Sequence, residues 1–242
     1  PLIPSYRDYP YLQQLSQDCF SISRDDRNYR IDEQVVKIIC RAKSILEQER
    51  GLVVKDRIFL NGYSSSGVFA QRFALLHPDI VETACIGGAS GSIPIPTEKL
   101  AYPLGIADYE SLTGKRFDLE SYSKIKFRYY VGELETQNKS NSRFDDFGQP
   151  APMHDMSYFD RSVPTEVGKY QRSVLGTEMF SRAQKTIQIL QSLGIDVQHK
   201  IILGRGHNNR NGIGVNELAD KFVNDTYKST IKSREINYGV SR

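Results

Sequence analysis

The sequence contains no tryptophan, only three cysteines and no long apolar run. The cysteines are odd in number and form no C-x-x-C pair, which is not typical of a disulfide framework. The patterns around Cys40 and Cys85 predict buried free thiols, so a reducing, cytoplasmic compartment is favoured. No stretch reaches the roughly 18 apolar residues of a membrane-spanning helix.

Charge of either sign is also not concentrated anywhere along the chain. Lys and Arg total 32 and Asp and Glu total 29, which gives a net charge of +3 with scattered basic residues. Binding to nucleic acid or to an anionic membrane would require basic residues clustered on one face. The glycine-rich stretch from Gly87 to Ser92 matches neither G-x-x-x-x-G-K-[ST] nor G-x-G-x-x-G, so it does not indicate a nucleotide site.

With 242 residues, 39% of them hydrophobic, the chain suits one large domain spanning residues 1–242. Apolar runs of strand length alternate with segments of helical periodicity, which predicts an α/β fold, a mostly parallel sheet flanked by helices. The first helix is expected to begin with Asp32 as its N-cap and to end at Gly51. Its apolar stripe comprises Val35, Ile38, Ile39, Ala42, Ile45 and Leu46. Strands are expected at 58–60, 80–86, 127–131 and 197–203, with helices from 68, from 177 to 194, and around Leu218, Phe222 and Val223.

The stretch Gly62-Tyr63-Ser64-Ser65-Ser66-Gly67 lies between a predicted strand and a predicted helix. Such a sharp reversal strains the backbone at its middle residue and requires small neighbours, as in the G-x-S-x-G nucleophile elbow. Ser64 would then be exposed at the carboxyl end of the strand. The N–H of Ser65, at the start of the helix, would donate to an oxyanion. Ser66 replaces the last glycine of the pattern, and a Ser-rich turn without chemistry is the alternative.

An acid and a histidine follow later strands, in the chain order serine, acid, histidine. His207 is favoured as the general base over His154, because it directly follows a strand in a glycine-flanked turn. The acid is less well defined by the pattern. Glu135 is preferred, and the nearby alternatives are Glu133, Asp145, Asp146 and Asp155.

These motifs resemble those of the α/β-hydrolase superfamily, most closely bacterial esterase-like hydrolases related to polyester depolymerases and feruloyl esterases. The resemblance runs over most of the stretch from Arg57 to Asn209 and rests on FLNGYSSSG with the following FAQRFALLHPD, on YYVGELET and on IILGRGHN. It implies α/β-hydrolase topology and a serine hydrolase that cleaves a small-molecule or oligomeric ester through an acyl-enzyme. Ser64 would be the nucleophile, Glu135 the acid and His207 the base, and no metal or cofactor is expected.

The resemblance also implies a second oxyanion donor, in a glycine-containing loop after an earlier strand. Nothing from Pro1 to Arg50 matches that loop, so the first strands of the superfamily sheet are expected to be missing from this sequence. The long polar stretch at 136–163 is expected to be a lid or a long loop.

Two other functions share these features. A protein with the same fold could bind a ligand without turning it over, and a peptidase or acyltransferase could use the same three residues.

Overall fold

Four parallel strands form the sheet of the protein, in the spatial order β1-β2-β3-β4. The computed structural model describes residues 14–89, 91, 93–133, 169–170, 173–176, 179–204 and 221–230. The strands are β1 (Ile58–Tyr63), β2 (Val81–Gly87), β3 (Lys126–Gly132) and β4 (Val197–Ile202). Because the strands are parallel, their carboxyl ends share one edge of the sheet. The predicted α/β fold with a parallel sheet is confirmed.

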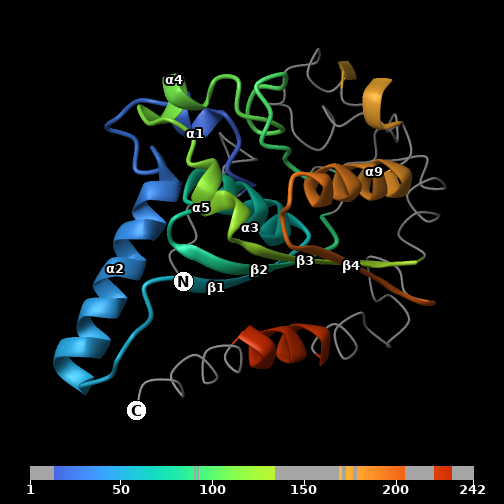
Figure 1. Ribbon diagram of the computed structural model, residues 1–242. Coiled ribbons are helices and arrows are strands. Elements are labelled where there is room, and N and C mark those ends of the chain that lie inside the picture. The colour runs from blue at the N-terminus through green and yellow to red at the C-terminus, as the bar shows by residue number, and fades with distance from the viewer. Residues whose placement is uncertain are drawn as a thin grey trace, which may run out of the picture.

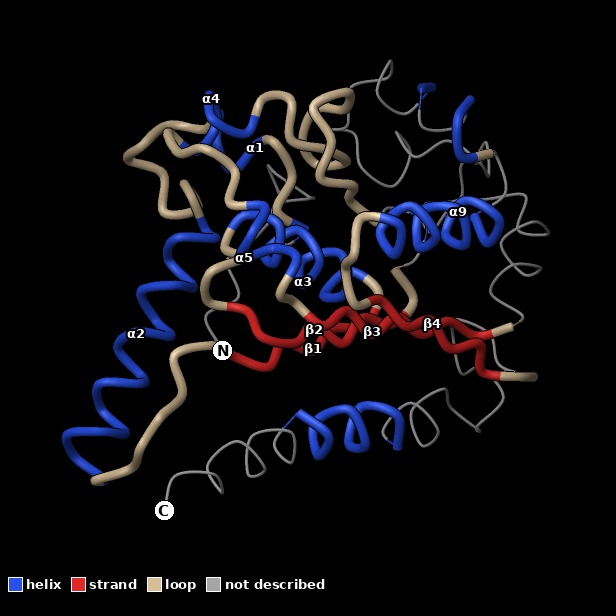
Figure 2. Tube along the Cα trace, in the orientation of Figure 1, coloured by secondary structure: helices blue, strands red, loops and turns tan. Residues whose placement is uncertain are grey.

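Helices cover both faces of this sheet (Figure 1). The described helices are α1 (Asp18–Ser21), α2 (Ile31–Arg50), α3 (Ser65–Leu76), α4 (Tyr109–Thr113), α5 (Leu119–Ser123) and α9 (Met179–Ser192), with a further helical segment at 221–230. Figure 2 shows α3, α5 and α9 on one face and the segment 221–230 on the other. Within the described residues, no helix combines the length and apolar character needed to cross a membrane.

The alternation of side chains along β3 divides the core into two layers. Phe127 and Tyr129 are buried in the large cluster on the α3 side, whereas Tyr130 belongs to the smaller cluster on the other side. Successive side chains of a strand point to opposite faces, so both faces of this strand are apolar. Tyr130 packs edge-on against Phe222 of the segment 221–230, with ring centroids 5.9 Å apart. Phe222 and Val223 therefore lie inward, as the sequence predicted.

Helix α2 differs from its prediction in two respects. Its N-cap is Arg30, so Asp32 lies within the first turn, whereas Gly51 ends the helix at φ 63° as predicted. Cys40 is exposed, and the prediction of a buried thiol there is wrong. The reason is that α2 extends away from the sheet (Figure 1), which leaves Ile38 60% and Leu46 38% exposed within the predicted apolar stripe. Cys85 in β2 is buried as predicted.

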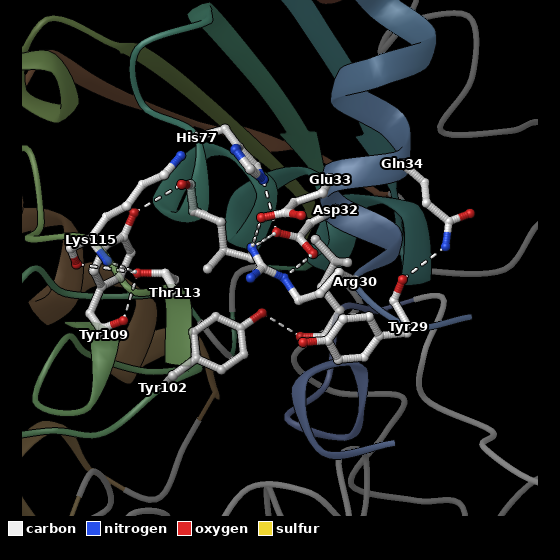
Figure 3. A network of polar contacts seen from close by, with 12 residues as sticks. Tyr29, Arg30, Asp32, Glu33, Gln34, His77, Tyr102, Tyr109, Thr113 and Lys115 are labelled. Atoms are coloured by element: carbon white, nitrogen blue, oxygen red, sulfur yellow. Dashed lines mark hydrogen bonds and ion pairs between the residues drawn. The ribbon is translucent and has the colours of Figure 1, made fainter. Parts of the chain in front are cut away.

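A buried ion network ties the start of α2 to the end of α3 (Figure 3). Asp32 is fully buried and accepts two hydrogen bonds from Arg30, from Nε at 2.9 Å and from Nη2 at 2.8 Å. The third contact is with His77, the C-cap of α3, whose Nε2 lies 2.9 Å from Asp32 Oδ2. A buried carboxylate with three such contacts is fully compensated, but each partner depends on the others.

The same network sets the ionisation of Asp32. Burial by itself raises the pKa of this carboxyl, but the hydrogen bonds from His77 and Arg30 outweigh burial and lower the pKa to about 2. A carboxyl group whose pKa is depressed by folding stabilises the folded state above its unfolded pKa, near 4, and loses that contribution as the pH falls towards 2.

We expect Asp32→Ala to lower the free energy of unfolding by about 3 kcal/mol, because it leaves Arg30 with only the partly exposed Glu33 carboxylate, 3.0 Å away, and removes the partner of His77. The wild-type protein should lose stability between about pH 4 and pH 2, and this part of the pH dependence should be weaker in Asp32→Asn. Urea unfolding across this pH range measures both effects. The control is Asp56→Asn, because Asp56 pairs with Lys43 at an exposed position and should contribute little. Equal stability of Asp32→Ala and wild type would contradict this account.

Candidate active site

The structure places Ser64 at a sharp junction between β1 and α3. Its φ of 56° and ψ of −122° are unusual for a residue with a side chain, and it is the N-cap of α3, although its hydroxyl accepts no capping hydrogen bond. A non-glycine residue in such a conformation costs about 1–3 kcal/mol and persists only where its surroundings impose it. The strained strand-to-helix turn predicted from the sequence is therefore present.

Hydrogen bonds hold this junction on both sides. The Ser64 N–H donates to the Gly87 carbonyl at the end of β2, at 2.9 Å, and the Val68 N–H donates to the Ser64 carbonyl, also at 2.9 Å. The Ser66 hydroxyl accepts from the Tyr63 N–H at 2.9 Å and donates to the Tyr63 carbonyl at 2.7 Å. Ser66 therefore closes the turn with its side chain, which explains why serine can stand where the pattern has glycine.

Close backbone approach explains the glycines of the turn. A Cβ on Gly62 would lie 2.2 Å from the Ser66 carbonyl oxygen, and a Cβ on Gly67 would lie 2.8 Å from the Gly87 carbonyl oxygen. Real Cβ atoms do not approach other atoms so closely. The demand for a glycine after the serine is thus met by Gly67, one position later than in G-x-S-x-G.

The predicted oxyanion donor lies next to Ser64. Ser65 is the first residue of α3, a helix of 12 residues. The first N–H groups of a helix have no acceptor within the helix, and the helix dipole favours negative charge at this end. The assignment of the Ser65 N–H as a donor remains a prediction that this placement supports.

The carboxyl ends of β3 and β4 are fastened together at the same edge of the sheet. The Glu133 N–H donates to the Ile202 carbonyl at 2.9 Å, and the Glu133 carboxylate accepts from the Gly204 N–H at 2.8 Å. Glu133, weighed from the sequence as an alternative acid, thus holds the start of the segment that leads to His207. Glu135 and His207 themselves lie outside the described residues, as do His154, Asp145, Asp146, Asp155 and the stretch at 136–163.

Two histidines lie away from Ser64. His77 bonds Asp32 at the far end of α3, and 12 helical residues span about 18 Å. His199 lies within β4, where burial lowers its pKa. Neither placement suits a base for Ser64.

The structure also shows a residue near the elbow that the sequence did not indicate. The side chain of Gln14 donates from Nε2 to the Ser65 hydroxyl at 3.1 Å. No local pattern signals this contact, since it joins positions far apart in the chain. In the part of the chain that the structure describes, no group of three or more His, Cys, Asp or Glu side chains could hold a metal ion.

Comparison with known proteins gives a distant structural similarity. No family model and no curated protein matches the chain. Among solved structures, it is similar to the LpqC poly(3-hydroxybutyrate) depolymerase from Bordetella parapertussis, with 14% identity and a TM-score of 0.48. The match covers 81% of this chain and 59% of that one, so this chain spans less than two thirds of the depolymerase chain. The function must therefore be inferred from this chain's own geometry.

Proposed function

We propose that this chain is a serine hydrolase that cleaves an ester through an acyl-enzyme. The observation that carries the proposal is the conformation of Ser64, a strained non-glycine residue at the carboxyl end of a parallel strand with a helix starting at the next residue. That geometry presents a serine side chain to a substrate and places a helix N-terminus beside it.

The chemistry follows from four groups. The Ser64 oxygen attacks the ester carbonyl carbon while its proton passes to His207, and the carbonyl electron pair moves onto the oxygen next to the Ser65 N–H. Return of that pair expels the alcohol, which takes its proton from His207. The oxygen of a water molecule then bonds to the acyl carbon while the water gives a proton to His207. The bond between the acyl carbon and the Ser64 oxygen breaks, the acid leaves, and the Ser64 oxygen takes the proton back from His207. Glu135 orients His207 and stabilises its charged form, so the reaction needs no metal or cofactor.

The position of the later strands supports the assignment of base and acid. The ends of β3 and β4 lie on the edge of the sheet where Ser64 lies, because all four strands are parallel. His207 follows Gly204 by three residues, and Glu135 follows Glu133 by two. Since the Glu133 carboxylate already accepts the Gly204 N–H, Glu135 is the better candidate for the acid.

A fluorophosphonate probe should label the wild-type protein at Ser64, because the activated oxygen displaces fluoride from phosphorus. Ser64→Ala should abolish labelling. The control is Ser192→Ala, which removes an exposed hydroxyl that bonds the Ile189 carbonyl in α9 and should leave labelling unchanged. The labelled residue is identified by mass spectrometry. A wild-type protein that stays unlabelled would favour a ligand-binding protein of the same fold.

We expect His207→Ala to lower kcat for a p-nitrophenyl ester by about 10⁴-fold or more while the unfolding temperature stays near that of wild type. Glu135→Gln should also be strongly impaired, because an amide in place of the carboxylate disturbs the histidine tautomer.

Glu133→Gln is the matched control for the acid, since its side-chain oxygen can still accept the Gly204 N–H, and Asp146→Asn tests a more distant alternative. A large loss in Glu133→Gln or Asp146→Asn together with an active Glu135→Gln would move the acid to that other position. A panel of ester, amide and acyl-acceptor substrates then separates an esterase from a peptidase or acyltransferase.

A further inference from the structure

The segment that precedes α1 lies against the start of α3 through Gln14. The Gln14 side chain reaches the hydroxyl of Ser65, the residue directly after Ser64, with Nε2 and Oγ 3.1 Å apart. A primary amide carries two N–H donors, and Ser65 takes one of them. Within the described part of the chain, the second N–H has no acceptor. An amide donor is therefore held next to Ser65, whose N–H is the predicted oxyanion donor.

The position of Gln14 is set by α3 itself. Its backbone carbonyl accepts a hydrogen bond from Arg72 Nη1 at 3.0 Å, and Arg72 is a residue of α3 that is only 1% exposed. Both contacts of Gln14 thus go to the helix that begins at the elbow. A side chain fixed to the same rigid element as the nucleophile keeps a constant distance from it, which is what a preorganised donor requires.

The next residue shows why Gln14 stays in this place. Leu15 is fully buried in the main core and has a φ of 51°. Its carbonyl accepts the hydroxyl of Tyr102, itself fully buried. The described chain has only three non-glycine residues at positive φ, and they are Leu15, Arg30 and Ser64. Backbone strain of this kind collects at functional sites, and two of these three residues flank the Gln14–Ser65 contact.

From these contacts we infer that Gln14 is the second hydrogen-bond donor to the oxyanion. This inference rests on the proposed function. The Ser65 N–H donates to the developing negative oxygen from the helix, and the Gln14 Nε2 donates from the side of the segment before α1. Amide side chains serve as oxyanion donors in acyl transfer, and removing one such donor typically lowers kcat by about 10²- to 10³-fold.

A second glutamine of the same segment, Gln17, makes hydrogen bonds that hold parts of the fold together. Gln17 donates from Nε2 to the Tyr102 carbonyl at 2.8 Å and to the Asp108 carboxylate at 3.3 Å. Its amide therefore joins two parts of the protein. Gln17→Ala is the matched control, because it removes the hydrogen bonds to Tyr102 and Asp108 from the same segment.

The test compares Gln14→Ala and Gln14→Met with wild type and with Gln17→Ala. All four proteins keep the backbone carbonyl of residue 14 that Arg72 requires, and methionine keeps the length of glutamine without its donors. The rate of Ser64 phosphonylation by a fluorophosphonate, kcat and KM for a p-nitrophenyl ester, and the unfolding temperature are measured for each. We expect both Gln14 variants to lose about a hundredfold or more in kcat and in phosphonylation rate with little change in KM, because the donor acts on the transition state. Gln17→Ala should keep the wild-type phosphonylation rate.

A loss in KM alone, or phosphonylation at the wild-type rate in both Gln14 variants, would overturn the inference while leaving the proposed function intact. A wild-type protein that is not phosphonylated at all would overturn the proposed function, and the inference with it.

Discussion

The conformation of Ser64 is the constraint on which the candidate site depends. Its positive φ turns the chain from β1 into α3 within one residue, so the first turn of the helix passes directly beneath the strand. That passage leaves no room for a Cβ on Gly62 or on Gly67. The strain is maintained by the hydrogen bond to the Gly87 carbonyl and by the two hydrogen bonds of the Ser66 hydroxyl. Sheet, turn and helix together keep a serine in a conformation it would otherwise leave.

Helix α3 is held by contacts along its length, and these contacts fix the place of Ser64 at its start. Ser64 stands at its beginning, and the buried Asp32–His77 pair holds its end. Midway along the helix, Arg72 fixes the backbone of Gln14. A rigid helix held at its end and in its middle keeps its N-terminus in a defined place, which is what an oxyanion site requires, because donors that must reorganise during the reaction contribute less.

The parallel arrangement of the strands explains how one site can draw on distant parts of the chain. Parallel strands end at a common edge, so residues after β1, β3 and β4 lie along the same edge of the sheet whatever their separation in sequence. The hydrogen bonds that join Glu133 to Ile202 and Gly204 show this for the ends of β3 and β4. Function in such folds depends on which side chains stand at that edge.

The sequence by itself determined the local course of the chain. Apolar periodicity and small residues indicated the strands, the helices and the turn at Ser64, because these patterns reflect the backbone repeat of each element. Only the tertiary structure decided the exposure of Cys40, the burial of Asp32 with His77, and the contact between Gln14 and the elbow. Each of these depends on which distant segment packs against a residue, and no repeat within a single element carries that information.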